Sequence, residues 1–250
     1  DVKNYRILVF KGQGKISGAR QVQVTRQLGE IESTFYKHHR SPHPDIFRVS
    51  NDPTEGCTNV GRSGWHIDGT FLPMPFKYQT MHFHSICEGG ETWFVPLNEF
   101  YEAQDEKTKE RWRQLWMVPR KPMAHPFVYQ HPVRGDTALM FHCGQGFAEC
   151  WLRDVPGASS SGTVRKVLDH ADMQEELTLK LNAIVDQIGF KMQWEEGDFA
   201  INDNLANCHY ATPGTQTKRE IGGLRILHRT TVAGDTMPTT HDGVQTVGWE

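Results

Sequence analysis

Short apolar segments that alternate with polar residues dominate the chain, and glycine or proline separates most of them. Alternation with a period of two residues predicts half-buried β-strands. We expect strands in the sequences YRILVFKGQG, HPDIFRVS, KYQTMHFHSI, ETWFVPL, TALMFHC, FKMQW, FAIND and GLRILHRTTV. Many short strands of this kind are typical of a β-sandwich or a jelly roll.

Residues 171–189 have helical periodicity instead. Their apolar side chains recur with the spacing of successive helical turns, and Gly189 is placed to end the helix. This apolar stripe consists of Leu177, Leu181, Ile184, Val185 and Ile188. The segment is therefore predicted to pack one face against the strands.

Two further segments are predicted to be helical. Residues 98–117 give a helix with Asn98 and Asp105 as candidate N-caps, and residues 17–32 give a shorter one. The fold class that follows is mainly β with flanking helices, in the form of a double-stranded β-helix (a jelly roll, cupin-like). We predict a single domain over residues 1–250, with a helical insertion around residues 98–190.

Composition and charge narrow the function classes. The chain of 250 residues has a net charge of −3 with mixed signs, which gives no basic surface for nucleic acid. No apolar run approaches the roughly 18 residues of a membrane span, and the first residues do not have the pattern of a signal peptide. The five cysteines are scattered and odd in number, which is typical of reduced thiols. We expect an intracellular, cytoplasmic protein.

The sequence SGWHIDGTF places a histidine and a carboxylate two residues apart. If this segment is a strand, His66 and Asp68 point to one face while Trp65 and Ile67 point to the other. Burial of Asp68 without a partner would cost several kcal/mol. Either a cation lies between the two side chains, or they form an ordinary hydrated pair.

A divalent cation needs a third protein ligand, and His209 in INDNLANCHYATPG is the best candidate. Two histidines and one carboxylate are the ligand set of non-haem Fe(II) oxygenases, which keep coordination positions open for substrate and O₂. A zinc hydrolase could use the same three ligands. The residues alone leave both classes open.

The last predicted strand suggests an anionic ligand. In GLRILHRTT, Arg225 and Arg229 alternate onto one face, whereas His228 lies on the other. Two arginines that face the inside of a jelly roll are costly unless they meet anions, and guanidinium binds carboxylates in a bidentate manner. A keto diacid fits this pattern, because a metal could chelate its 2-oxo acid end while Arg225 holds the distal carboxylate. A non-catalytic jelly roll that binds an anion is the remaining alternative.

Four sequences, in the same order, resemble the taurine dioxygenase (TauD/TfdA) family of Fe(II)/2-oxoglutarate dioxygenases. They are WHIDGTF, EGGETWFVPL, GDFAINDNLANCHYATPG and LRILHRTTVAGD. The resemblance implies that His66, Asp68 and His209 ligate Fe(II). It also implies that Thr92 shares the distal carboxylate of 2-oxoglutarate with Arg225.

The substrate residues follow from the same resemblance. Arg229 matches the position that binds the anionic group of the substrate, and Tyr36 keeps an aromatic hydroxyl. Ser33 stands where a histidine is expected and Arg62 where an amide is expected, so taurine is not the predicted substrate. Arg62 beside Arg229 would suit a substrate with more than one carboxylate, such as an amino-acid-derived precursor of a natural product.

The resemblance implies oxidation of an unactivated C–H bond of a small anionic substrate, with Fe(II), 2-oxoglutarate and O₂. Hydroxylation, desaturation and oxidative cyclisation need the same ligands. Asp68 disfavours a halogenase, in which the carboxylate is absent. Members of the family often form dimers or tetramers, so a homo-oligomer stays open.

Other histidines have weaker interpretations. The sequence HFH (residues 82–84) looks like a metal motif, but it lies on a different predicted strand from His66 and Asp68. We interpret it as structural or as part of the pocket lining. HHRSPH (residues 38–43) is interpreted as a polar loop over the site.

Overall fold

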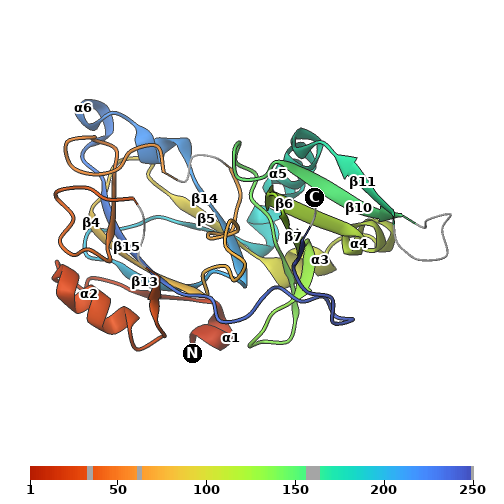
Figure 1. The fold of residues 1–250 in the computed structure, drawn as a ribbon. Helices are drawn as coiled ribbons and strands as arrows, with labels where there is room; N and C mark the ends of the chain where they lie inside the picture. The colour runs from red at the N-terminus through yellow and green to blue at the C-terminus, as the bar shows by residue number, and fades with distance from the viewer. Residues whose placement is uncertain (33–35, 61–63, 156–163, 249–250) are drawn as a thin grey trace.

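The computed structural model describes residues 1–32, 36–60, 64–155 and 164–248, and the elements below belong to these ranges. Figure 1 shows two groups of strands, one on each side of the view, with β4, β13 and β15 at the left and β6, β7, β10 and β11 at the right. The mainly β fold class predicted from the alternation is confirmed.

The largest sheet is antiparallel and has six strands. Its strand order is β1-β13-β4-β15-β2, and β3 pairs with β15 at the edge of this path. The strands are β1 (Ile7–Phe10), β13 (Phe199–Asp203), β4 (Tyr78–Ser85), β15 (Ile226–Val232), β2 (Ile31–Glu32) and β3 (Phe47–Ser50). Helix α2 (Gly18–Thr25) packs against β4 and β15, and Figure 1 shows it beside this sheet.

A second antiparallel sheet has the order β12-β5-β14. Its strands are β12 (Phe190–Met192), β5 (Thr92–Pro96) and β14 (Asn207–Ala211). Helix α5 (His170–Ile188) packs against β5 through Leu177, Leu181 and Val185, which are buried. The helix begins with Asp169 as its N-cap and ends before Gly189, as the apolar stripe predicts.

The remaining strands form a five-stranded and a two-stranded sheet. The five-stranded sheet has the order β11-β10-β6-β7-β16: β11 (Val164–Leu168), β10 (Cys150–Val155), β6 (Leu115–Arg120), β7 (Met123–Pro126) and β16 (Val247–Gly248). The two-stranded sheet pairs β8 (Val128–Gln130) with β9 (Thr137–Leu139). The other helices are α1 (Val2–Tyr5), α3 (Leu97–Glu102), α4 (Glu106–Arg113), the 3₁₀-helix η1 (Pro213–Gln216) and α6 (Arg219–Gly222).

The predicted helix over residues 98–117 was too long. It is two short helices, α3 and α4, followed by strand β6. Asp105 is an N-cap, since its side chain accepts a hydrogen bond from the amide of Thr108. Asn98 is not, because α3 begins one residue earlier and the Asn98 side chain accepts from the amide of Thr137.

The expected helical insertion around residues 98–190 is helical only at its two ends, because strands β6 to β11 lie between α4 and α5. The predicted helix over residues 17–32 is likewise shorter, since α2 ends at Thr25 and β2 follows. In both places pairing with distant strands overrides the local pattern.

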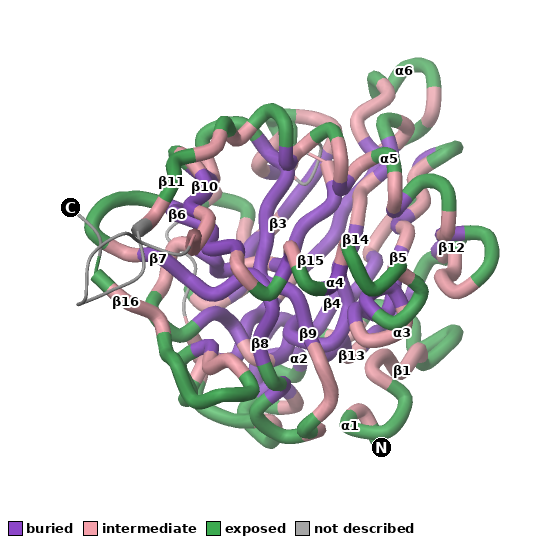
Figure 2. Tube along the Cα trace, turned by 90° about the vertical axis from the view of Figure 1, so that its right-hand side faces the viewer, coloured by how far each residue is buried: buried purple, intermediate pink, exposed green. Residues whose placement is uncertain are grey.

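The core has two main parts. One lies between α5 and the inserted strands and contains Trp65, Trp112, Trp151, Phe127 and Phe141. The other is formed by Phe47, Met81, Phe83 and Leu227 of the six-stranded sheet, Phe94 of the β12-β5-β14 sheet, and Trp194, which follows β12. Figure 2 shows central strands such as β3 and β4 as mostly buried, and many of the connecting loops as exposed. Among the described residues, no helix combines the length and the apolar composition that crossing a bilayer requires.

Candidate metal centre

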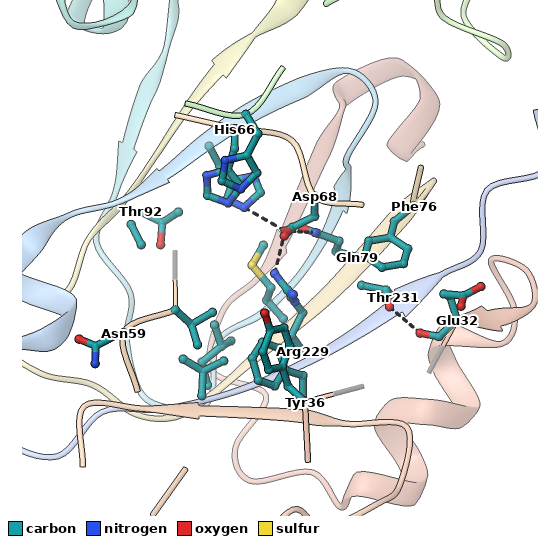
Figure 3. A pocket seen from close by; sticks show the side chains of 18 of the residues that line it. Glu32, Tyr36, Asn59, His66, Asp68, Phe76, Gln79, Thr92, Arg229 and Thr231 are labelled. Atoms are coloured by element: carbon teal, nitrogen blue, oxygen red, sulfur yellow. Dashed lines mark hydrogen bonds and ion pairs between the residues drawn. The ribbon is translucent and has the colours of Figure 1, made fainter. Parts of the chain in front are cut away.

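Three side chains that are distant in the sequence converge at one end of a pocket. One ligand atom from each of His66, Asp68 and His209 lies within 4.8 Å of the other two. The two histidines are 3% and 7% exposed. Figure 3 shows Asp68 beside the imidazole rings, with Gln79 and Arg229 on its other side.

Backbone pairing brings the two histidines together. The amide of His66 donates to the carbonyl of His209 at 3.1 Å, and the amide of His209 donates back to His66 at 2.9 Å. His66 therefore forms an isolated bridge with β14 instead of belonging to a strand, so the expected strand around it is wrong. The predicted alternation still holds, because Trp65 and Ile67 are buried in the core while His66 and Asp68 line the pocket.

Asn204 fixes the backbone of Asp68 from both sides. Its Oδ1 accepts from the Asp68 amide at 2.9 Å, and its Nδ2 donates to the Asp68 carbonyl at 2.9 Å. The carboxylate is thereby held beside His209, whose Nε2 lies 3.3 Å from Asp68 Oδ2. Sequence reasoning missed Asn204, although it lies in the same INDN sequence that precedes His209.

The orientation of His66 suits metal ligation. Its Nδ1 lies 2.7 Å from the carbonyl of Gly64, which can only accept, so Nδ1 carries the proton and Nε2 keeps its lone pair. A hydrogen bond of this kind behind a ligand is typical of metal-bound histidine. Burial, and then the charge of His209, lowers the pKa of His66 to about 4, so the ring is neutral at physiological pH.

Asp68 is held as a carboxylate. Burial by itself raises its pKa, but the charge of Arg229 and the hydrogen bond from His209 hold the pKa well below its usual range. Its Oδ2 accepts from Arg229 Nη1 at 2.7 Å and also from Gln79 Nε2. An anionic oxygen among two imidazoles is a donor set that fits Fe(II).

Arg225 lies buried in the same pocket and is 3% exposed. Burial lowers its pKa to about 10, which leaves the guanidinium charged at neutral pH. Its Nε is buried without a hydrogen-bond partner, and no carboxylate of the described residues forms an ion pair with it. A buried charge without a counter-ion is costly, so an anionic ligand is expected here.

Thr92, on β5, is 5% exposed and lines the same pocket. Its Oγ1 accepts a hydrogen bond from Trp194 Nε1 at 2.9 Å, which leaves the hydroxyl proton for a ligand. Arg225 and Thr92 therefore both face the cavity that contains the three-residue cluster.

The cavity has a volume of about 410 Å³ and lies between the six-stranded sheet and the β12-β5-β14 sheet. Its apolar lining includes Phe47, Val49, Phe71, Phe76, Met81, Phe147 and Leu227. His142 also lines it and stacks on His66 with ring centroids 4.5 Å apart. The space suits a small molecule that has an apolar body and an anionic end.

The predicted substrate residues are only partly described. Arg229 lines the pocket, uses one Nη on Asp68 and has a buried Nε without a partner. Tyr36 also lines it and stacks on Phe47, with ring centroids 5.0 Å apart. Ser33 and Arg62 lie outside the described residues.

Among the described residues there is a second group with metal-ligand spacing, formed by His82, His84 and His228. The interpretation of HFH as pocket lining is wrong, since neither His82 nor His84 lines the cavity. The signal that could have found this group is the placement of His228 on the face of its strand opposite to Arg225 and Arg229.

Comparison with known proteins shows the family. A family model described as "Taurine catabolism dioxygenase TauD, TfdA family" matches residues 1–231. The chain is 26% identical over 274 residues to an alpha-ketoglutarate-dependent sulfate ester dioxygenase of Pseudomonas putida, covering 96% of this chain and 80% of that protein. It is 22% identical over 260 residues to the (S)-phenoxypropionate/alpha-ketoglutarate-dioxygenase of Sphingobium herbicidovorans, covering 92% and 83%.

Solved structures agree with this result at the level of the fold. A putative alpha-ketoglutarate-dependent taurine dioxygenase from Burkholderia xenovorans superposes with a TM-score of 0.72 at 23% identity, covering 98% of this chain and 84% of that one. The structure of AAD-2 in complex with Mn(II) and N-oxalylglycine gives a TM-score of 0.67 at 22% identity, covering 95% and 85%.

Proposed function

The chain belongs to the TauD, TfdA family of dioxygenases, and from this premise we propose that it oxidises an unactivated C–H bond of a small anionic substrate. Enzymes of this family use Fe(II), 2-oxoglutarate and O₂. We assign His66, Asp68 and His209 as the Fe(II) ligands. The fold in this proposal is the double-stranded β-helix, because the pocket lies between two antiparallel sheets.

The observation that carries the proposal is the buried guanidinium of Arg225. It lies in the same cavity as the His-Asp-His cluster and has no counter-ion among the described residues. A zinc hydrolase has no need of such a charge, whereas the distal carboxylate of 2-oxoglutarate neutralises it. The hydroxyl of Thr92 supplies a further donor to the same carboxylate.

The residues of this chain have separate roles in holding the metal ligands and excluding water. When bound, Fe(II) supplies the activation of O₂ that is coupled to decarboxylation of 2-oxoglutarate to succinate and CO₂. Asp68 contributes a fixed negative charge to the cluster, and Gly64 and Asn204 keep His66 and Asp68 in place. The apolar and aromatic lining excludes water from the substrate pocket, which limits reactions that compete with oxidation of the substrate.

Arg229 is assigned to the anionic group of the substrate. Its bond to Asp68 fixes one end of the guanidinium, and its buried Nε has no partner among the described residues. The anion would then lie next to the metal ligands, which places the adjoining carbons within the cavity. Hydroxylation, desaturation and cyclisation are all compatible with this position.

The test begins with anaerobic addition of Fe(II) and 2-oxoglutarate to the purified chain. We expect a weak visible charge-transfer band in the wild type and its absence in Asp68→Ala. Succinate release is then measured in air against aryloxy carboxylates, alkyl sulfates, sulfonates and amino-acid-derived dicarboxylates. At least one of these should raise succinate release together with its own oxidation.

Two outcomes would contradict the proposal. Substrate turnover that continues without O₂ and releases no succinate would indicate a metal hydrolase. Anion binding without any turnover or charge-transfer band would indicate a non-catalytic jelly roll.

A further inference from the structure

The histidine cluster of His82, His84 and His228 lies on the face of β4 and β15 that is turned away from the cavity. Neighbouring residues Gln79 and Met81 of β4, and Arg229 of β15, line the cavity on the other face. One ring nitrogen of each histidine lies within 4.8 Å of the other two. Two of the three rings are almost fully buried, at 0% exposed for His82 and 2% for His228.

An irregularity in β4 turns His84 toward His228. His82 pairs with His228 and Phe83 with Leu227 in one register, but the register then shifts, so that Ser85 pairs with Ile226. His84 is the additional residue at this bulge. The ring centroids of His84 and His228 are consequently 4.1 Å apart, closer than the 6.5 Å between the directly paired His82 and His228. Bulges commonly re-aim side chains near functional sites.

Each of the three rings has a buried nitrogen without a partner: His82 Nδ1, His84 Nε2 and His228 Nδ1. His82 Nε2 lies 2.8 Å from the carbonyl of Gly14 and must donate to it, so its unpartnered Nδ1 holds a lone pair. Three buried polar atoms without partners in one cluster are costly, and a ligand that satisfies them would stabilise the fold.

The charges around the cluster compensate one another. Arg48 is 3.2 Å from Glu55, and Lys15 is 2.8 Å from Glu196. A cation in the cluster therefore does not meet an unpaired positive charge from either residue. His84 is only partly buried, and Glu196 beside it is exposed, which gives a path from solvent.

Arg48 is the group that competes with a cation. Its Nη1 lies 2.6 Å from His228 Nε2, and a guanidinium only donates, so it uses the lone pair of that nitrogen. Ligation through Nε2 needs this lone pair directly. Ligation through Nδ1 would put the proton on Nε2, where two donors would face each other. Either way the contact with Arg48 must open, while Arg48 can keep its bonds to Glu55.

We propose that His82, His84 and His228 form a second metal site that binds Zn²⁺. Three imidazoles without a carboxylate favour a borderline metal such as zinc over Mg²⁺ or Ca²⁺. A fourth position stays open to water on the side of Glu196. Because the ligands come from adjacent strands, bound zinc ties β4 to β15 directly behind the residues that line the cavity.

The test is equilibrium dialysis of the full chain, first stripped with a chelator, against micromolar free Zn²⁺, followed by metal analysis. We expect two zinc ions per wild-type chain, because the His-Asp-His cluster also binds zinc, and one per chain in His84→Phe. His39→Ala removes an exposed histidine that is not part of the cluster and should retain two. Arg48→Met should bind the second ion several-fold more tightly, because the competitor is gone.

A background variant isolates the second site. Asp68→Ala/His209→Ala should bind a single Zn²⁺, and adding His84→Phe to it should abolish binding. Co²⁺ in place of Zn²⁺ should give a visible spectrum in the first variant and none in the second. Circular dichroism and the melting temperature without metal show whether each variant folds.

Several results would overturn the proposal. They are one zinc per wild-type chain, two in a folded His84→Phe variant, or no binding by the Asp68→Ala/His209→Ala background. An unchanged zinc affinity in Arg48→Met would exclude His228 as the third ligand. All readouts are metal content or spectra, so they do not depend on whether the proposed dioxygenase activity is correct.

Discussion

A cluster of three potential ligands lies on each side of the strand pair β4 and β15, and one cluster contains a charged carboxylate while the other does not. On the cavity face, Gln79 and Arg229 bond to Asp68, which completes the cluster with His66 and His209. On the other face, His82, His84 and His228 form a cluster without a carboxylate. The same two strands thus support a charged site and a neutral one.

The charges explain the difference in chemistry between the two faces. The cavity face combines one anion, the half-buried Asp68, with two cations, the buried Arg225 and the half-buried Arg229, so it suits a metal together with anionic ligands. The outer face offers neutral imidazole nitrogens, which suit a metal alone. A carboxylate and an unpaired arginine, more than the number of histidines, mark the proposed catalytic site.

Loss of the carboxylate should have the largest effect. Asp68→Ala removes one of three ligands and leaves Arg229 without its partner, so we expect Fe(II)-dependent succinate formation to fall below detection. Changing a residue behind a ligand commonly costs about 10–100-fold, and loss of the ligand itself should exceed this. Succinate release at saturating Fe(II) is the measurement.

Asp52→Ala is the matched control for this change. It removes an aspartate that also pairs with an arginine, Arg219, but outside the cavity. Its succinate release should stay at the wild-type level. Activity in a folded Asp68→Ala variant would show that the carboxylate is not what distinguishes the cavity cluster from the histidine cluster.

Arg225→Met should have the next largest effect. A hydrogen bond to a charged group contributes about 1.5–3 kcal/mol, which corresponds to an increase of about 10–100-fold in the KM for 2-oxoglutarate. The turnover number at saturating 2-oxoglutarate should change much less. Arg219→Met changes an exposed arginine at the start of α6, outside the cavity; it is the control and should leave both constants unchanged.

Part of this site could be predicted from the sequence, because alternation along a strand is local information. Arg225 and Arg229 were placed on one face and His228 on the other from RILHR alone, and the pocket lining agrees. The fold class followed from the same alternation. His209 was a candidate third ligand from its sequence context, and the family resemblance supported that choice, but no local pattern shows that it pairs with His66.

Other features depend on pairing between distant segments. Trp112, Leu115 and Trp116 have helical spacing, so the predicted helix continued through them, yet Leu115 begins β6 and pairs with β10. The outer cluster depends on the pairing of β4 with β15, which brings His228 beside His82 and His84, and the HFH sequence does not show which strand pairs with it. The roles of Ser33 and Arg62 stay predictions from the resemblance.

His125 gives a reference case for the two clusters, because both of its ring nitrogens are satisfied. Nε2 bonds to the carbonyl of Thr70 at 2.9 Å and Nδ1 to the hydroxyl of Thr246 at 2.8 Å. Burial lowers its pKa from 6.5 to about 4. Below pH 6.5 the unfolded chain therefore binds a proton that the folded chain does not, and the stability that neutral His125 contributes is lost as the pH falls toward 4.

The size of this loss is about 2 kcal/mol at pH 5, from 1.36 kcal/mol for each pH unit below 6.5. Urea unfolding at pH 7.5 and pH 5 measures it. The wild type should lose about 2 kcal/mol more than His125→Gln, whose amide can keep both hydrogen bonds without titrating. Equal losses would show that the fold tolerates a charged imidazole at this buried position, and that burial alone does not keep such rings neutral.

The smallest effect is expected at Thr92, which tests whether charge is what distinguishes the cavity face. Thr92→Val removes one neutral donor and the acceptor of Trp194 Nε1, a change worth about 0.5–1.5 kcal/mol. The KM for 2-oxoglutarate should rise about two- to tenfold, and Thr92→Ser should restore it. If Thr92→Val raised this KM as much as Arg225→Met does, a neutral hydroxyl would equal the buried guanidinium, and the contrast between the charged and the neutral face would lose its physical basis.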